Sequence, residues 1–433
     1  MPASPASAAT FLVTSASDTG PGSLREAIDL ANGSPGPDAV AFSIPGNFVI
    51  ESELPPISDD LGIYGGGAYP QTIQIDHGRI ARIFRVSPGV IVSLDFLVIT
   101  GGRAPTVGSA PGYGGCIYNA GKLTLTQVRV ETCLADHGGA IYNASDAELT
   151  LDDSRVDSGT ALLDGGGIYN SGSLQLSDSI LRNGYSNRHG AGIYNSAGAS
   201  VHVVSSTLEK NVSNRMGGGI FNAGATVTLR DSAVVGNFAV DMGGGILSDG
   251  ATASVTVRNS TLSGNGISMT SFNGGGAILS TGSMLLIHAT VVDNSAPFGS
   301  GVAGQFSSKS SIFDNAGENC GQTPGLTMTD LGQNLASDDS CASFGVVSAS
   351  ALKLGPLADN GGLTPTHALL PGSVAIDHAT ACTDNLGNAV GADQRGQTRP
   401  MDGDGDAAAL CDSGAYEYAD GIFANGFEEL VTP

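Results

Sequence analysis

The sequence predicts an all-β fold, a right-handed parallel β-helix in which one strand-rich unit stacks on the next. A glycine-rich unit such as GGGIYNSG recurs over residues 114–305, and a short alternating strand such as SLQLSDS follows most copies. The chain has 64 glycines among 433 residues, no tryptophan and only 6% aromatic residues, a composition that suits a stack of tight turns. Each unit is too small to bury its own apolar side chains, so neighbouring units must bury them together.

Residues 1–35 are expected to form an N-terminal segment with one short helix. Ser23 and Glu26 have the spacing of a capping box, and Gly33 stands where such a helix should end. A helix at this place would cover the open end of the solenoid core, as repeat proteins require. Three apolar residues would share its buried face: Leu24, Ile28 and Ala31.

Residues 36–307 are expected to form the β-helix itself, with about ten to twelve turns of three strand segments each. Parallel stacking at about 4.8 Å per turn would bring equivalent side chains into columns. One inward column should hold isoleucines that recur at intervals of 24 to 32 residues: Ile117, Ile141, Ile168, Ile193, Ile220, Ile246 and Ile278. One corner should hold asparagines whose amides bond along the column: Asn119, Asn143, Asn170, Asn195 and Asn222.

Residues 308–433 share no period and predict a separate, irregular C-terminal region held by cysteines and turns. The six cysteines of the chain fall into three pairs that are close in sequence, and none forms a C-x-x-C motif. An even, well-spaced set points to disulfides and an oxidising compartment. The expected pairs are Cys116–Cys133, Cys320–Cys341 and Cys382–Cys411.

The charge balance restricts the partners that this chain can bind. It carries 18 Lys and Arg against 41 Asp and Glu, a formal net charge of −23, which argues against nucleic acid and anionic membranes. No run of about 18 apolar residues predicts a transmembrane segment. The first ten residues lack the basic and apolar parts of a signal peptide, so a secreted chain is expected to have lost its signal. We expect a monomer.

Several motifs resemble a known group of proteins. The GGGIYN repeat resembles right-handed parallel β-helix proteins of bacterial surfaces, which are related to the pectate-lyase-like fold. SLREAI near the N-terminus resembles the CSLREA-type motif of secreted bacterial β-helix proteins, with Gly22 in place of the cysteine. NGGLTPTHALLPGSVAID, DQRGQTRP and CDSGAYEY resemble the choice-of-anchor Q domain. The resemblance implies a secreted or cell-surface bacterial protein; the fold hosts lyases, hydrolases, esterases and adhesins, so it leaves function open.

A basic cluster on two consecutive turns is the first candidate for chemistry. Alignment on the glycines brings His137, Asp164 and His189 into one column directly before the glycines, with Arg188, Arg215 and Asp241 one residue earlier in their turns. A polysaccharide lyase needs a cation for the substrate carboxylate and a base for the adjacent proton. A hydrolase needs two carboxylates, for which Asp164 and Asp241 are candidates. The expected catalytic residues are Arg188, His189, Arg215, Asp164, His137 and Asp241; Arg182 and Lys210, expected along the same edge, would bind substrate. The alternative is a solvated edge of surface ion pairs.

A column of aromatic residues is the second candidate. Tyr169 and Tyr194 belong to a series that runs from Tyr118 to Phe221, one ring per turn. An exposed ladder of this kind could stack on sugar rings and bind a polysaccharide. The alternative is that the rings pack on one another between turns.

The stretch MDGDGDAAALCD is the third candidate. Asp402, Asp404 and Asp406 alternate with glycines in the manner of the start of a calcium loop, although Ser413 stands where the bidentate glutamate of such a loop is expected. Calcium is therefore an expected cofactor, and an acidic turn without an ion is the alternative.

These features lead to two hypotheses about function. The first is an extracellular carbohydrate-active protein, a polysaccharide lyase or glycoside hydrolase that holds a long chain in a groove along the turns. The second is a non-catalytic surface or adhesin-type protein that binds a cell-surface glycan. A cleft with a convergent base would favour the enzyme, and a flat ridge of ion pairs would favour the adhesin.

Overall fold

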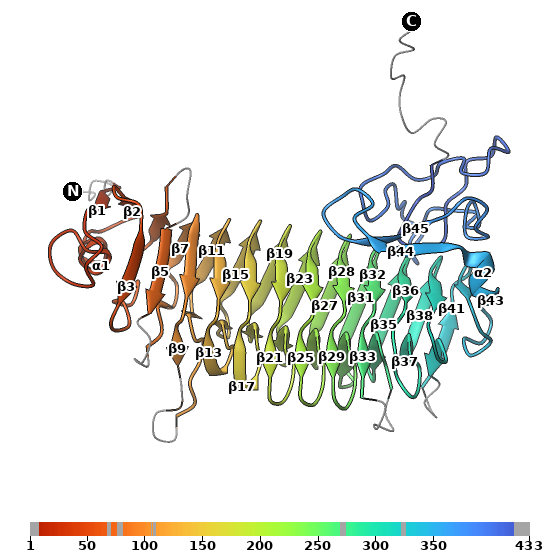
Figure 1. Ribbon diagram of the computed structural model, residues 1–433, viewed down its shortest axis with the longest axis horizontal. Coiled ribbons are helices and arrows are strands. Elements are labelled where there is room, and N and C mark those ends of the chain that lie inside the picture. The colour runs from red at the N-terminus through yellow and green to blue at the C-terminus, as the bar shows by residue number, and fades with distance from the viewer. Residues whose placement is uncertain are drawn as a thin grey trace, which may run out of the picture.

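A parallel β-solenoid makes up most of the molecule, and one irregular region lies against its last turns (Figure 1). The structure is a computed structural model, and it describes residues 8–66, 71–75, 81–104, 106, 110–268, 274–321 and 326–419. Within one turn the chain passes through four sheets in the order A, B, D and C, and each strand pairs with its equivalents in the turns before and after. The architecture is the predicted all-β right-handed parallel β-helix.

Sheets A and B are the longest, with 13 strands each. Sheet A contains β1 (Thr10–Val13), β2 (Asp38–Phe42), β4 (Leu61–Tyr64), β7 (Ile91–Asp95), β11 (Lys122–Thr126), β15 (Glu148–Asp152), β19 (Ser173–Ser177), β23 (Ser200–Val204), β27 (Thr226–Arg230), β31 (Ser254–Arg258), β35 (Ser283–Ile287), β38 (Phe306–Lys309) and β41 (Met328–Asp330). Sheet B contains β3 (Asn47–Ile50), β5 (Gln71–Ile75), β8 (Leu97–Thr100), β12 (Arg129–Glu131), β16 (Arg155–Asp157), β20 (Ile180–Arg182), β24 (Thr207–Glu209), β28 (Ala233–Val235), β32 (Thr261–Ser263), β36 (Thr290–Val292), β39 (Ile312–Asp314), β42 (Leu335–Ala336) and β43 (Gly345–Val346).

Sheets C and D complete each turn, with 10 and 7 strands. Sheet C contains β6 (Phe84–Val86), β10 (Ile117–Asn119), β14 (Ile141–Asn143), β18 (Ile168–Asn170), β22 (Ile193–Asn195), β26 (Ile220–Ala223), β30 (Ile246–Asp249), β34 (Ile278–Ser280), β37 (Val302–Gly304) and β40 (Cys320–Gly321). Sheet D contains β9 (Arg103–Ala104), β13 (Leu134–His137), β17 (Thr160–Asp164), β21 (Tyr185–Ser186), β25 (Val212–Ser213), β29 (Phe238–Ala239) and β33 (Gly266–Ile267). The prediction of three strands per turn was therefore wrong in the turns that carry sheet D, because most strands of this sheet have only two residues and are too short to show alternation in the sequence.

The predicted register of the core is confirmed. Ile168 pairs with Ile193 and Ile193 pairs with Ile220, and the whole column from Ile117 to Ile278 is fully buried. Next to it, Asn170 Nδ2 donates to Asn195 Oδ1 over 2.8 Å, and the same bond joins each consecutive pair from Asn119 to Asn222 at 2.8 to 2.9 Å. A second ladder, at the corner between sheets B and D, was not predicted. It joins Asn211, Asn237, Asn265, Asn294, Asn315 and Asn319.

The N-terminal helix α1 (Leu24–Asn32) begins and ends as the sequence predicts. The Ser23 side chain accepts a hydrogen bond from Glu26 N at 3.2 Å, and Glu26 Oε2 accepts one from Gly22 N at 2.5 Å. Its buried residues are Leu24, Ala27, Ile28 and Ala31, which pack on the core beside β1 and β2. The helix therefore closes the first end of the solenoid.

The parallel sheets extend beyond the expected boundaries. β1 lies inside residues 1–35, and strands continue past position 307 as far as β43. The C-terminal region that follows contains α2 (Ala349–Leu352) and the antiparallel pair β44 (Leu354–Ala358) and β45 (Thr366–Leu369). This region, which is blue in Figure 1, lies against the outward face of sheet B. There Thr261 Oγ1 donates to Gln394 Oε1 at 2.7 Å. The sequence repeat fades before the sheets end, because the last strands keep the backbone pairing of the earlier turns but not their recurring side chains.

The three predicted disulfides, Cys116–Cys133, Cys320–Cys341 and Cys382–Cys411, are all present. Among the described residues, no helix has the length and apolar character needed to cross a bilayer.

Candidate functional site

The predicted column of His137, Asp164 and His189 forms on three consecutive turns. His137 at the end of β13 pairs with Asp164 at the end of β17, and Gly165 N donates to His189 O at 3.0 Å. A sharp turn follows each of these residues. At Gly190, φ is +62°, and an added Cβ would lie 2.3 Å from the backbone oxygen of Ile193, so only glycine fits there.

Asp164 lies at the centre of this group and is 5% exposed. His137 Nδ1 is 3.5 Å from Asp164 Oδ2, and Arg188 NH1 is 3.8 Å from the same oxygen. These separations are long for hydrogen bonds. Asp164 Oδ1 is buried without a hydrogen-bond partner among the described residues. The buried carboxylate thus makes only long contacts, with an imidazole and a guanidinium at the same oxygen, and its other oxygen is not hydrogen-bonded.

The two histidines are held in the neutral form. Burial lowers the pKa of His137, and the negative charges of Asp164 and Asp136 offset that effect only in part. Burial also lowers the pKa of His189, where Asp164 again acts in the opposite direction and Arg188 adds to the lowering. The Nδ1 atom of each imidazole is buried and has no hydrogen-bond partner in the described part of the chain. Two neutral bases therefore flank one carboxylate.

Aromatic neighbours fix the planes of both imidazoles. Tyr113 stacks on His137 with the ring centres 5.6 Å apart, and Phe221 lies 4.8 Å from the ring of His189. Tyr113 was not identified from the sequence, although it precedes Gly114 as His137 precedes Gly138, and in the structure it pairs with His137 as the first member of the same column.

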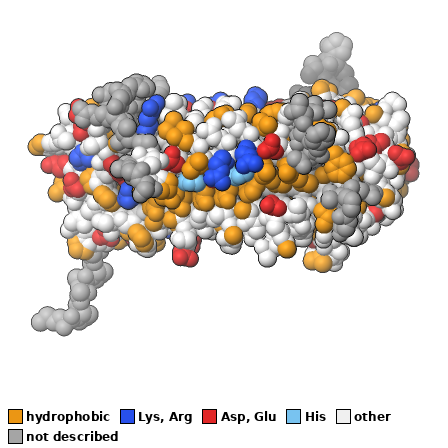
Figure 2. All heavy atoms as spheres, turned by 90° about the horizontal axis from the view of Figure 1, so that it is seen from below, with side chains coloured by type: hydrophobic (Ala, Val, Ile, Leu, Met, Phe, Trp, Pro, Cys, Tyr) orange, Lys and Arg blue, Asp and Glu red, His pale blue; other side chains and the backbone are white. Residues whose placement is uncertain are grey.

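The arginines beside the histidines reach the surface. The Arg188 side chain is 49% exposed, and the Arg215 side chain is 53% exposed and lies 3.4 Å from Asp241 Oδ2. Figure 2 shows basic and histidine side chains together on a band of apolar side chains that follows the long axis of the molecule. Both arginines can therefore contact an anion in solvent while remaining near a carboxylate.

Arg182 and Lys210 lie away from this group, contrary to the expectation of a single basic edge. Arg182 ends β20 in sheet B, and its Nε is 2.9 Å from Asp157 Oδ2. Lys210 follows β24 and lies 3.9 Å from Glu209. The short strands of sheet D separate Arg182 from Arg188 in one turn, by β21, and Lys210 from Arg215 in the next, by β25. The glycine alignment missed this because it does not show that a fourth strand inserts a corner.

The aromatic column forms, but the ring faces are covered. From Tyr118 to Phe221 consecutive rings are stacked with centres 4.6 to 5.4 Å apart and planes within 8 to 16° of parallel. The guanidinium of Arg85 lies 5.4 Å from the ring of Tyr118 at the first end. Tyr169 and Tyr194 therefore present only ring edges and hydroxyls to a ligand, and the geometry supports packing between turns rather than stacking on sugars.

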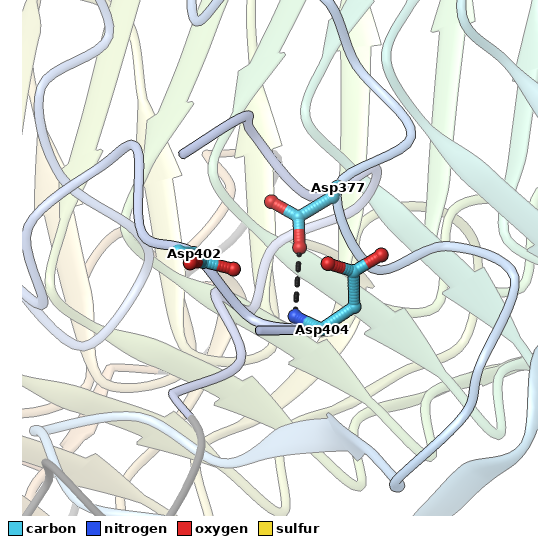
Figure 3. A group of neighbouring side chains, drawn as sticks. All are labelled: Asp377, Asp402 and Asp404. Atoms are coloured by element: carbon cyan, nitrogen blue, oxygen red, sulfur yellow. Dashed lines mark hydrogen bonds between the residues drawn. The ribbon is translucent and has the colours of Figure 1, made fainter. Parts of the chain in front are cut away.

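The acidic loop has a different third member from the one that the sequence suggested. Carboxylate oxygens of Asp377, Asp402 and Asp404 all lie within 4.8 Å of one another, whereas Asp406 is outside this group. Asp377 Oδ2 accepts hydrogen bonds from Gly403 N at 2.9 Å and from Asp404 N at 3.0 Å, as Figure 3 shows for Asp404. Asp377 was missed because it is distant in sequence from the loop: it ends the stretch NGGLTPTHALLPGSVAID, which gives no sign of an ion ligand.

A comparison with family models agrees with the fold. A family model described as a right handed beta helix region matches residues 113–296, which include the whole column around Asp164. Among solved structures, that of the pectate lyase Pel9A is similar with a TM-score of 0.41 and 14% identity, over 96% of this chain and 98% of that one. No curated protein matches the sequence.

Proposed function

We propose that this protein is an extracellular enzyme that cleaves an acidic polysaccharide by β-elimination at the cluster around Asp164. The observation that carries the proposal is the set of buried polar atoms without hydrogen bonds, His137 Nδ1, Asp164 Oδ1 and His189 Nδ1, beside two exposed arginines. Leaving a buried polar atom unpaired costs about 1–3 kcal/mol, and three of the nine such side-chain atoms among the described residues gather in this one cluster. The three disulfides support an oxidising, extracellular location.

The proposed reaction uses these residues as follows. Arg188 and Arg215 bind the carboxylate of a uronate unit, which makes the neighbouring C–H bond more acidic. Neutral His189 accepts that proton, and Asp164 stabilises the imidazolium that forms. The electrons of the C–H bond form the C=C bond while the bond to the glycosidic oxygen breaks. The leaving oxygen takes a proton from solvent, so the products are an unsaturated uronate and a new sugar end.

Hydrolysis by Asp164 and Asp241 is the less favoured reaction. Met216 and Met242 continue the column from His189, so Asp241 lies three turns from Asp164. At about 4.8 Å per turn the two residues are about 14 Å apart along the axis. The carboxylates of glycosidases are about 5–9.5 Å apart.

A non-catalytic, glycan-binding surface protein is the second candidate. The ion pairs Arg188–Asp164 and Arg215–Asp241 on the exposed ridge, and the covered faces of the tyrosine stack, support it. Such a protein would bind acidic glycans through the arginines and leave them intact.

A panel of acidic and neutral polysaccharides tests both candidates. Elimination produces absorbance at about 235 nm, whereas hydrolysis produces reducing ends without it. We expect absorbance to rise with a uronate polymer only. Binding to such polymers without cleavage of any member of the panel would contradict the enzyme and favour the second candidate.

We also propose that the acidic loop binds one calcium ion through Asp377, Asp402 and Asp404. Carboxylates are the ligands that calcium prefers, and these three offer oxygens in one place. The same oxygens hold the loop through backbone N–H groups, among them Gly405 N, which donates to Asp402 Oδ1 at 2.8 Å. The ion would therefore add to a turn that the chain already forms.

A further inference from the structure

The contact between the C-terminal region and the β-helix contains a buried histidine among positive charges. His288 follows β35 and is fully buried. Arg399 NH1, from the C-terminal region, lies 3.1 Å from His288 Nδ1. A guanidinium can only donate hydrogen bonds, so in this contact His288 Nδ1 accepts and the proton of the neutral imidazole is on Nε2, which is buried and has no hydrogen-bond partner among the described residues. Protonated His288 would lose this bond.

The groups that face His288 come from four segments, and the nearest charged side chains are positive. Arg258 at the end of β31 and Lys309 at the end of β38 flank it on the turns before and after. Both also hold the C-terminal region, because Arg258 donates to Ala389 O at 3.3 Å and Lys309 donates to Asp384 O at 2.9 Å. A proton on His288 would add a further positive charge among cations that make the contact.

The carboxylates of this region are already engaged or neutral. Glu417 Oε2 lies 3.2 Å from Arg399 NH1. Asp393 pairs with Arg395 at 2.7 Å. Burial raises the pKa of Asp412 to about 8, so this acid is largely uncharged at neutral pH. Within the described part of the chain none of these three carboxylates bonds to the imidazole of His288, and only the backbone of Asp412 acts to raise the pKa of this histidine.

We propose that His288 is an acid-sensitive switch in the contact between the C-terminal region and the β-helix, and that its protonation weakens this contact. Close to His288 this contact includes hydrogen bonds from single backbone amides. Gly414 N donates to Ser310 O at 2.8 Å, and Ala415 N donates to Thr290 Oγ1 at 2.9 Å. Repulsion between His288 and Arg399 would act on the segment that carries both amides. The inference does not depend on the proposed enzymatic activity.

The sign of the effect follows from the direction of each pKa. Burial and Arg399 lower the pKa of His288 well below its usual value, so the docked state is favoured at neutral pH and loses that stability as pH falls below about 6.5. Burial raises the pKa values of Asp412 and Glu417, so these acids act in the opposite direction and favour docking at low pH. The contribution of His288 must therefore be measured against a variant that lacks only its titration.

His288→Asn is that variant, because an amide oxygen can take the place of Nδ1 as acceptor for Arg399 and does not titrate. Backbone hydrogen exchange of the full chain is measured between about pH 7.5 and about pH 4.5, with correction for the intrinsic rate. The readout is the segment 410–419, and Ile168–Asn170 in the central turns is the internal reference. His202→Asn, which changes an exposed histidine on sheet A, is the matched control.

On acidification, we expect backbone exchange in segment 410–419 of the wild type to become at least ~10-fold faster than in His288→Asn. His202→Asn should behave as the wild type. Equal pH dependence in the wild type and His288→Asn would overturn the proposal. Nitrogen NMR of labelled histidines in the wild type gives a test that does not depend on folding of the variant. We expect the Nε2–H tautomer at neutral pH, and an Nδ1–H tautomer would also overturn it.

Discussion

At the scale of the residue, the chemistry of this protein depends on how deeply a few polar side chains are buried. Asp164 and the two imidazoles beside it lie on the same short corner as Arg188, yet the arginine side chain is about half exposed and the carboxylate is not. Because the histidine base is buried, a substrate can reach it only where an exposed cation binds the substrate next to it. The combination of neutral histidine and exposed arginine is what the proposed elimination requires.

Replacement of Arg188 or of His189 should therefore abolish most of the proposed lyase activity. We expect Arg188→Ala and His189→Ala each to lower turnover on the best uronate polymer by at least ~100-fold, the usual scale for loss of charge stabilisation or of a general base. Arg182→Ala is the matched control, since Arg182 pairs with Asp157 in sheet B and is outside the cluster. Turnover of both cluster variants at the level of the control would contradict the assignment, provided that the melting temperatures are unchanged.

The same histidines should make stability depend on pH. The folded-state pKa values of His137 and His189 are lowered, so the unfolded chain binds protons more readily and the folded state loses stability as pH falls below about 6.5. The double variant His137→Asn, His189→Asn lacks this pH-dependent contribution to the free energy of unfolding. Urea unfolding at about pH 7.5 and about pH 5.5 should show a larger loss in the wild type than in the double variant. An equal loss in the two proteins would show that the histidines titrate alike in both states.

At the scale of the element, the corners of each turn are held by side-chain ladders rather than by loops alone. Asn195 accepts from Asn170 at 2.8 Å and donates to Asn222 at 2.9 Å, so one amide serves two neighbouring turns. The ladder also ties each corner to the following strand of sheet A, because Asn170 Nδ2 donates to Ser200 O at 2.9 Å. The pairing of one turn with the next is thus fixed at the corner as well as along the strands.

Loss of one member of this ladder should cost more than loss of an exposed asparagine. We expect Asn195→Ala to lower the free energy of unfolding by about 1–3 kcal/mol, because it leaves a donor on Asn170 and an acceptor on Asn222 short of a partner. Asn187→Ala, on the exposed corner of the same turn, should change it by less than about 0.5 kcal/mol. Chemical denaturation of the two variants measures the difference, and similar values would mean that the ladder does not stabilise the stack.

The inward isoleucines are the second device at this scale. Ile193 has no exposed surface and pairs with Ile168 and Ile220 on the adjacent turns. An unpaired charge at this position would cost several kcal/mol, so Ile193→Asp should unfold the central turns. Gln175→Asp, outward on β19, should leave the melting temperature close to that of the parent. A parent-like melting temperature for Ile193→Asp would contradict the register of the whole core.

At the scale of the whole molecule, the C-terminal region and the solenoid form one structure through contacts between residues far apart in the chain. Asn259 donates to Ala392 O at 2.6 Å, and Ser263 Oγ lies 2.9 Å from His367 Nε2. The outward-facing residues of sheet B differ between the part that is exposed and the part that the C-terminal region covers. They are charged at Arg155 and Asp157 in β16 and are small at Ala233 in β28, where the covered part begins. The long chain segment between these contacts should make assembly of the region slow relative to the local turns.

Calcium should stabilise this assembly if the acidic loop binds it. We expect a chelator to lower the melting temperature of the purified protein and added calcium to restore it, because an ion that binds only the folded state stabilises it by mass action. The variant Asp377→Asn, Asp402→Asn should lose this response, and Asp406→Asn should keep it because Asp406 is outside the group. Identical melting curves with calcium and with chelator would show that the loop is an acidic turn without an ion.

The sequence by itself determined the solenoid, its register and its cysteine pairs. A unit that recurs at a nearly constant interval can bury its isoleucines and pair its asparagines only by placing each copy on the last, so local repetition fixes the long-range contact. It also located the column of His137, Asp164 and His189, because these residues keep the same distance from their glycines. None of these inferences required knowledge of how one sheet meets another.

Only the tertiary structure decided what surrounds that column. The fourth strand of each central turn separates Arg182 from Arg188 and Lys210 from Arg215, and the stacked rings cover one another's faces. Asp377 reaches the acidic loop, and Arg399 reaches His288, from distant parts of the chain. Such contacts depend on the angles at the corners of the turns and on how a non-repeating segment docks. Each contact is made once, between residues that no common interval relates, so it leaves no periodic signal in the sequence.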